Sequence, residues 1–209
     1  MTKEELLKTA KPILFNADMV RAILDGRKTV TRRVVKPRYR EGDGGFQVCW
    51  SKENPNAKWV EKMDEDEGSY DPPRYVMPPY QPGDYLYVRE SFCPNYFDAS
   101  VRKNKFAYKA DYYREKFGDT IPEPKWRPSI HMPKEAARIF LKITDVRIER
   151  LNVISQDQII QEGIQAEYLL SAYHELWDST VKPKDRDEYG WDANPWCWVI
   201  EFERVGAEE

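Results

Sequence analysis

The sequence predicts an α+β fold in which several strands form a small mixed β-barrel flanked by short helices. Two observations lead to this prediction. Segments with the alternating, β-branched or aromatic composition of strands are distributed along the whole chain of 209 residues. The helical patterns between them are few and short, whereas a doubly wound parallel sheet alternates strand and helix throughout. The sequence therefore favours a barrel over a parallel sheet.

The N-terminal part is predicted to run from a strand through a helix to a second strand. A short buried strand is expected at 12–15, and Asn16 is typical of a residue that caps a following helix. Gly26 is suited to the left-handed position at the end of that helix. The second strand is expected over 28–35, with Lys28 in the turn that precedes regular alternation.

A change of composition marks the segment from about 38 to 81 as an insertion. Glycines, prolines and an acidic run gather there, and such a composition is typical of turns and irregular structure. A hairpin is expected within this insertion, with its strands at about 46–50 and 59–63.

Four further strands and two helices are predicted after this insertion. The strands are expected, in chain order, at 85–90, after the turn Pro82-Gly83-Asp84, and at 105–111, 138–151 and 196–203. The helices are expected between the capping-box residue Ser155 and Gly163, and at about 167–177. Loops are expected at 122–133 and 178–195.

The overall charge and hydropathy exclude two classes of protein. The chain has 33 Lys and Arg against 36 Asp and Glu, a formal net charge of -3, so bulk positive charge does not hold it on nucleic acid. Any basic surface is therefore local. No apolar run approaches the roughly 20 residues of a membrane span, and the polar, helix-prone N-terminus does not resemble a signal sequence. We expect a soluble, cytoplasmic protein with no membrane partner.

Residues that form disulfides or bind metals are scarce. Cys49, Cys93 and Cys197 are odd in number and far apart, which argues against a disulfide framework and against structural zinc. His131 and His174 are the only histidines, so there is little material for a histidine metal site or a Ser-His-Asp triad. We therefore expect no metal and no other cofactor.

The densest group of chemically active residues follows the predicted helix end. Lys28 and Thr31 are suited to act as base and nucleophile, because a threonine hydroxyl attacks an acyl carbon only when a neighbouring group takes its proton. A lysine has a reference pKa of about 10.4, so it needs burial or nearby cations to act as a base at neutral pH. Arg27, Arg32 and Arg33 are such cations if they crowd the same cleft. The alternative is a solvated basic face, since cations suit the C-terminal end of a helix.

Glu162 is the third catalytic candidate. A carboxylate in the last turn of a helix opposes the helix dipole at a cost of roughly 0.3–1 kcal/mol, so a compensating partner is expected, and Lys28 would serve. In that position Glu162 would orient the lysine or pass a proton to a leaving group. The alternative is an exposed glutamate at a frayed helix end.

Further residues are candidates for substrate binding. Trp126 and Trp196 are suited to stack on a nucleic-acid base, a contact worth about 1–3 kcal/mol where it forms, although most tryptophans pack in a core. Arg89 and Glu90 leave the end of their strand on opposite faces and are suited to pair with a ligand or with neighbouring side chains. The candidate substrate-binding residues are Arg27, Arg33, Arg89, Glu90, Trp126 and Trp196.

Taken together, these segments resemble an ASCH domain, the activating-signal-cointegrator homology domain. The resemblance rests, in chain order, on Ile23-Leu24-Asp25-Gly26-Arg27-Lys28-Thr29-Val30-Thr31-Arg32, Pro82-Gly83-Asp84, the strand at 138–151, Gln161-Glu162-Gly163-Ile164 and the strand at 198–203. The segments Val88-Arg89-Glu90-Ser91-Phe92 and Trp126-Arg127-Pro128-Ser129-Ile130-His131-Met132-Pro133 look like the longer branch often encoded by phages and prophages. The implied single domain spans 1–209, with its core at about 12–37, 82–92 and 124–205 and insertions at about 38–81 and 93–123.

The resemblance implies a PUA-like β-barrel and a link to RNA or modified nucleosides. In the small bacterial members that hydrolyse N4-acetylcytidine, the family's lysine, threonine and glutamate fall on Lys28, Thr31 and Glu162. The implied activity is a metal-independent amide hydrolysis, in which Thr31 attacks the acyl carbonyl, Lys28 activates it and Glu162 assists proton transfer. The implied setting is a bacterial or phage-infected cell.

Two other functions stay open at this point. An RNA-binding module would bind phosphates through Arg27, Lys28, Arg32 and Arg33 and would bind bases through aromatic side chains, with an affinity that falls steeply as salt rises. A ribonuclease would use the same lysine near a scissile phosphate. The chain is longer than the small family enzymes, and its insertions would roof, enlarge or block the cleft.

Overall fold

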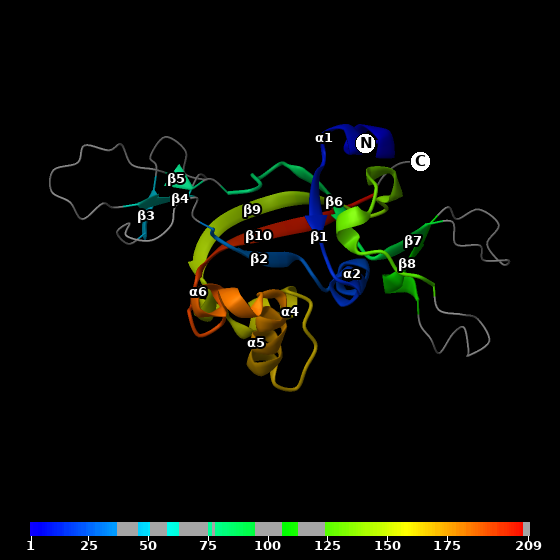
Figure 1. Cartoon of the computed structure of the whole chain (residues 1–209). Helices are drawn as coiled ribbons and strands as arrows, with labels where there is room; N and C mark the ends of the chain where they lie inside the picture. The colour runs from blue at the N-terminus through cyan, green and yellow to red at the C-terminus, as the bar shows by residue number, and fades with distance from the viewer. Residues whose placement is uncertain are drawn as a thin grey trace. The chain divides into compact units, whose positions relative to one another are not determined.

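The protein has an α+β architecture (Figure 1). The computed structural model describes residues 1–36, 78–94, 106–112 and 124–206, together with the backbone of the strands at 46–50, 58–62 and 75–76. Its main sheet has five strands in the spatial order β1 (Lys11–Leu14), β6 (Tyr85–Arg89), β9 (Phe140–Arg150), β10 (Trp196–Val205) and β2 (Val30–Val34). No closed barrel is seen among the described strands. The predicted α+β class is confirmed, whereas closure into a PUA-like barrel stays a prediction.

Two smaller sheets and several short helices complete the described part. One small sheet has the order β3 (Phe46–Trp50), β4 (Lys58–Lys62) and β5 (Tyr75–Val76), and the other pairs β7 (Phe92–Pro94) with β8 (Phe106–Tyr108). The α-helices described are α1 (Lys3–Thr9), α2 (Ala17–Leu24), α4 (Gln156–Gln161), α5 (Leu169–Thr180) and α6 (Arg186–Tyr189). None of the helices in these ranges has the length and apolar character needed to cross a membrane.

The chain divides into two compact units, each assembled from separated stretches. The first unit contains residues 1–29, 84–142 and 203–209, and the second contains 30–83 and 143–202. Strands β9 and β10 contribute residues to both units. The predicted single domain over 1–209 stays a prediction, and the insertions expected at about 38–81 and 93–123 lie largely outside the described residues.

In the first unit, β6 pairs with strands on both sides. It runs parallel to β1, with Ile13 opposite Val88, and antiparallel to β9, with Leu86 opposite Leu141. All four of these residues are buried. Their branched apolar side chains are typical of a strand that is covered on its faces.

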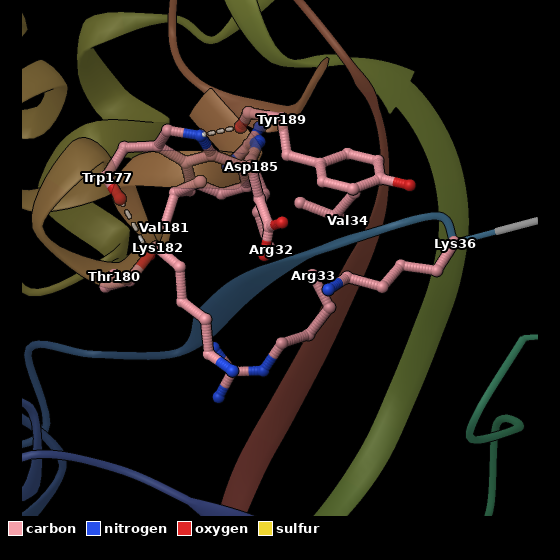
Figure 2. Close-up of a pocket in the computed structure, with 10 residues that line it drawn as sticks. All are labelled: Arg32, Arg33, Val34, Lys36, Trp177, Thr180, Val181, Lys182, Asp185 and Tyr189. Atoms are coloured by element: carbon pink, nitrogen blue, oxygen red, sulfur yellow. Dashed lines mark hydrogen bonds between the residues drawn. The ribbon is translucent and has the colours of Figure 1, made fainter. Parts of the chain in front are cut away.

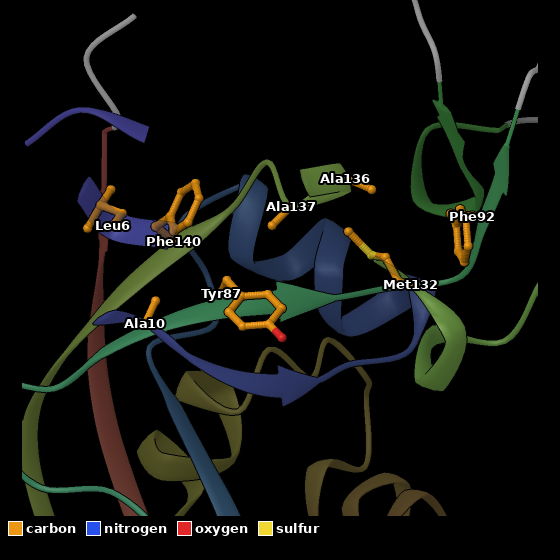
Figure 3. Close-up of a cluster of buried hydrophobic side chains, with 8 residues drawn as sticks. All are labelled: Leu6, Ala10, Tyr87, Phe92, Met132, Ala136, Ala137 and Phe140. Atoms are coloured by element: carbon orange, nitrogen blue, oxygen red, sulfur yellow. The ribbon is translucent and has the colours of Figure 1, made fainter. Parts of the chain in front are cut away.

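A buried apolar cluster joins helix α1 to strands of the first unit (Figure 3). Its members are Leu6, Ala10, Tyr87, Phe92, Met132, Ala136, Ala137 and Phe140. Leu6 comes from the N-terminal helix α1, whereas Met132 and the two alanines come from the segment that leads into β9. The predicted helix-prone lead is therefore an ordered helix whose apolar residue belongs to the core.

In the second unit, β10 pairs antiparallel with β2, and Val199 lies opposite Arg32. Four consecutive residues of β10, from Cys197 to Ile200, are buried. Because consecutive residues of a strand point to opposite faces, both faces of β10 are covered along this stretch. A second apolar cluster lies beside it and consists of Leu151, Ile154, Ile159, Tyr173, Trp177 and Cys197.

Local sequence signals placed most helix ends and strands correctly. The Asn16 side chain accepts a hydrogen bond from the amide of Met19 at 2.8 Å, as a helix N-cap does. Ser155 and Gln158 form the predicted capping box, with hydrogen bonds of 3.2 Å and 2.9 Å. The predicted hairpin also forms, since β3 and β4 pair antiparallel.

Three predictions need correction. The strand expected at 105–111 ends at Tyr108 and continues as a 3-10 turn over Lys109–Asp111. The loop expected at 122–133 contains a 3-10 turn at Ser129–His131. The loop expected at 178–195 contains helix α6, which has only four residues and no side-chain N-cap, so its sequence carries little helical signal.

We predict that Phe140→Ala strongly destabilises the fold. Phe140 is 1% exposed within the first cluster, and truncation of such a side chain typically costs about 3–5 kcal/mol of unfolding free energy because it leaves a cavity. Ile130→Ala is the matched control, since Ile130 is 60% exposed and should change stability by less than about 0.5 kcal/mol. Urea denaturation of the two variants tests this, and similar losses in both would contradict the assignment of Phe140 to the core.

Candidate active site

The backbone of Lys28 is fixed by the end of α2. The amide of Gly26 donates to the carbonyl of Ile23 at 3.1 Å, and the amide of Arg27 donates to the carbonyl of Ala22 at 2.8 Å. This pair of bonds is a Schellman motif, and Gly26 has the left-handed φ of 74° that the motif requires. The amide of Lys28 also donates to the carbonyl of Ala22, at 3.0 Å. Lys28 therefore lies in the turn before β2, as predicted.

The side chain of Lys28 is buried in the first unit. It is 2% exposed, and its Nζ lies 5.5 Å from the centroid of the Phe15 ring. Lysine is rarely buried to this extent, because removal of an ammonium group from water costs free energy. The alternative of a solvated basic face does not describe Lys28. It does describe Arg27, which is partly exposed and pairs with Asp25 at 2.8 Å.

Thr31 and Arg32 are consecutive buried residues of β2 in the second unit. Thr31 is 1% exposed and lies opposite Ile200 of β10. Adjacent residues of a strand point to opposite faces, so the two side chains have different surroundings. Because Lys28 belongs to the first unit and Thr31 to the second, their pairing as base and nucleophile stays a prediction.

Glu162 lies at the end of α4, which closes in the same way as α2. The amide of Gly163 donates to the carbonyl of Ile160 at 2.8 Å, the amide of Ile164 donates to that of Ile159 at 3.4 Å, and Gly163 has a φ of 92°. Glu162 is the C-cap residue and is 4% exposed. The expected alternative of an exposed glutamate at a frayed end is therefore wrong.

Two side chains contact the Glu162 carboxylate within the second unit. Arg32 Nη1 lies 3.5 Å from its Oε1, and the Tyr173 hydroxyl donates to the same oxygen at 3.4 Å. Burial and the nearby carboxylate raise the pKa of Tyr173 well above its ordinary value, so this hydroxyl keeps its proton. Arg32 is therefore one partner that offsets the unfavourable helix dipole at Glu162. The expected contact between Glu162 and Lys28 stays a prediction.

Arg32 also connects to a wider network of charges. Its Nη2 lies 3.2 Å from Glu149 of β9, and Glu149 in turn accepts from Arg147 at 2.6 Å. The side chain of Arg32 is wholly buried, and its Nε has no hydrogen-bond partner among the described residues. Cys197 lies in the same electrostatic environment, and burial raises the pKa of its thiol to about 12, so the thiol is not an available nucleophile at neutral pH.

A cavity of about 360 Å³ lies in the second unit between β2 and the helical segment (Figure 2). Arg32, Arg33 and Lys36 line it from β2 and the residues that follow, and Trp177, Lys182 and Tyr189 line it from α5, its C-terminal loop and α6. The Lys36 ammonium lies 5.0 Å from the centroid of the Tyr189 ring. Burial lowers the pKa of Arg33, and the Glu162 carboxylate opposes this shift.

Glu90 has a structural partner in the first unit. It is 1% exposed and accepts two hydrogen bonds from Arg138, at 2.8 Å and 3.0 Å. Arg138 also binds Asp111 and lies over the Tyr108 ring at 4.0 Å from its centroid. Burial raises the pKa of Glu90, and its hydrogen bonds to Arg138 act in the opposite direction. This closed network favours a structural role over ligand binding for Glu90.

The other predicted substrate-binding residues contact protein groups. Arg89 donates to the carbonyl of Ile130. Trp126 packs edge-on against Tyr112, with ring centroids 5.5 Å apart. In the second unit, the guanidinium carbon of Arg150 lies 4.3 Å from the centroid of the Trp196 ring. The indole Nε1 of Trp196 has no hydrogen-bond partner among the described residues.

The structure therefore brings together some predicted residues and not others. Glu162 and Arg33 lie in the electrostatic environment of the second unit, whereas Arg89, Glu90 and Trp126 belong to the first. The sequence analysis missed Tyr173 as a partner of Glu162. Tyr173 lies 11 residues after Glu162, and no sequence pattern links a hydroxyl at that separation to a helix end. The contact forms because α5 packs on α4. Comparisons of the chain with protein-family models, curated proteins and solved structures found no match.

We predict that Arg32→Ala lowers the unfolding free energy by about 3–5 kcal/mol, because it leaves two carboxylates without their buried partner. Arg27→Ala is the control, since its ion pair with Asp25 is partly exposed and should contribute less than about 1 kcal/mol. Arg32→Lys keeps the charge but loses the second contact, so its loss should be intermediate. Chemical denaturation measures all three, and a small loss for Arg32→Ala would contradict the role of the network.

We also predict a pH-dependent difference between the parent protein and Glu90→Gln. Because the folded-state pKa of Glu90 is raised above 4.5, the stability that Glu90 contributes is present below that pH and is lost as the pH rises through the folded pKa. The stability of the parent relative to Glu90→Gln should therefore fall as the pH rises from about 4 to 7.

Urea denaturation at a series of pH values tests this prediction. Glu135→Gln is the matched control, because Glu135 is exposed in the same unit and should show a flat difference across the range. A relative stability of the parent that increases with pH would show that Arg138, rather than burial, dominates the titration of Glu90.

Proposed function

We propose that this protein is an ASCH-domain amidohydrolase with a PUA-like barrel, acting on N4-acetylcytidine or a related acylated nucleoside, free or within RNA. One observation supports the proposal above the others. Five polar or charged side chains are buried among the described residues, and Lys28, Thr31 and Glu162 are three of them. The sequence pattern selected these residues independently of burial. Burial of a polar or charged side chain costs free energy, so a protein that keeps such side chains buried often uses them for its function.

The proposed reaction needs a nucleophile, a base and an acid. Lys28, as the neutral amine, accepts the proton of the Thr31 hydroxyl while the Thr31 oxygen attacks the acetyl carbon. The C–N bond then breaks, and the proton that Lys28 has taken passes to the departing cytidine amino group with the assistance of the Glu162 carboxylate. Water hydrolyses the acetyl ester on Thr31, which releases acetate and restores the hydroxyl. No metal takes part in this scheme.

Local structure supports the assignment of each role. Lys28 and Thr31 are three residues apart, so the chain keeps their Cα atoms within about 11 Å of each other. The backbone before Lys28 and the backbone around Glu162 are each fixed by a Schellman motif. Fixed backbones reduce the entropy that is lost when catalytic groups are oriented. Removal from water also favours the neutral amine that a lysine base requires.

We predict that Lys28→Ala lowers the rate of cytidine release from N4-acetylcytidine by at least about 100-fold, the typical contribution of a positioned general base. Thr31→Val should abolish release, because it removes the hydroxyl at constant shape, and Thr31→Ser should retain part of it. Lys184→Ala is the control with an exposed lysine and should match the parent. Chromatographic detection of cytidine and acetate measures each rate.

The outcomes separate the three candidate functions. Release by the parent but not by Lys28→Ala supports the amidohydrolase. Release at the parent rate by Lys28→Ala contradicts the assigned role of the lysine. If neither protein releases cytidine, hydrolysis of this substrate is contradicted, and RNA binding or RNA cleavage becomes the favoured function. Salt-dependent RNA binding and strand scission by the same pair of proteins distinguish these two.

A further inference from the structure

The cavity of the second unit has an uneven distribution of charge. Arg32, Arg33, Lys36 and Lys182 line it together with the carboxylate of Asp185. Arg32 pairs with carboxylates outside the lining, and Arg33 lies in the field of one of them. Lys36 and Lys182 form no ion pair with a carboxylate in the part of the chain that the structure describes. The chain as a whole has a net charge of -3, so this concentration of cations is local. Like charges that share a cavity repel one another, and an anion between them removes the repulsion.

A buried donor without an acceptor is found on the same wall. Both terminal nitrogens of Arg32 lie near carboxylates, but Nε has no partner among the described residues although the side chain is wholly buried. An unsatisfied buried donor costs about 1–3 kcal/mol. The Arg32 side chain has no accessible surface, so this N–H is not open to a ligand, and recognition of an anion in the cavity rests on Arg33, Lys36 and Lys182.

The remaining walls are aromatic and apolar. Trp177 is held by a hydrogen bond of 2.9 Å from its indole Nε1 to the carbonyl of Tyr189, so the two residues are linked as one wall (Figure 2). Val34 and Val181 add apolar surface. The volume of about 360 Å³ falls within the range of small-molecule sites. The cavity therefore suits a ligand with an anionic end and a flat apolar body.

We propose that this cavity binds a small organic phosphate in which a phosphate monoester is carried on a flat aromatic body, as in a mononucleotide. A phosphate offers three terminal oxygens and nearly two negative charges, which match cations that approach from both β2 and the loop after α5. The aromatic wall contacts the ring. Lys36 and Lys182, on which the test of this site depends, take no part in the proposed hydrolysis.

Isothermal titration of the full chain with adenosine 5′-monophosphate, adenosine and inorganic phosphate tests the proposal. An adenine nucleotide is used because it is not a product of the proposed cytidine reaction. The nucleotide should bind, and adenosine should bind at least about tenfold more weakly because it lacks the charged group. The double variant Lys36→Gln with Lys182→Gln should weaken nucleotide binding by at least about tenfold. Both lysines are exposed, so the fold should persist.

Lys184→Gln is the matched control, because Lys184 is exposed near Lys182 but does not line the cavity. It should change nucleotide binding less than twofold. Equal weakening by Lys184→Gln and by the double variant would overturn the proposal in favour of diffuse attraction. Absence of nucleotide binding at millimolar concentration would overturn it outright, as would inorganic phosphate that binds as tightly as the nucleotide. Lys28→Ala should bind the nucleotide normally, which separates this test from that of hydrolysis.

Discussion

The buried guanidinium of Arg32 is the interaction on which the second unit depends. It connects three elements, because Arg32 belongs to β2, Glu149 to β9 and Glu162 to the end of α4. A guanidinium without partners in this position would cost far more than the fold can supply, and two carboxylates offset that cost only while all three groups stay in place. The main effect of these ion pairs is therefore to fix how β2, β9 and the end of α4 are arranged, and their net contribution to the free energy of unfolding is smaller.

A second constraint comes from the backbone at the two helix ends. Both α2 and α4 end in a Schellman motif with a left-handed glycine, at Gly26 and Gly163. The motif satisfies the last carbonyl groups of each helix and directs the following chain. The first motif fixes the backbone just before Lys28, and the second fixes the backbone around Glu162. A helix end thus brings a polar residue into a buried position without leaving its backbone unsatisfied.

The parts of the structure that could be predicted are those with local causes. Asn16 and Ser155 begin helices because a side-chain oxygen reaches an amide three residues ahead, and a sequence displays that spacing directly. The partner of Glu90 could not be predicted in this way. Arg138 lies 48 residues away in sequence, and only the folded sheet brings it close. The same reasoning applies to the contact of Glu162 with Arg32, which lies 130 residues away in sequence, whereas its predicted contact with Lys28 stays a prediction.

The two units differ in how they treat their buried charges, and this difference separates structural from ligand-binding groups. In the first unit, Arg138 pairs with Glu90 and Asp111, so each charged group of that network has a partner within the protein. In the second unit, Arg32 is matched by carboxylates, but the cavity that it lines also holds Lys36 and Lys182, which pair with no carboxylate of the described chain. A network that is balanced within the protein gains nothing from a ligand. An unbalanced one gains electrostatic energy from any anion that fits its shape, so the excess of cations at this cavity is the chemical signature that a binding site retains.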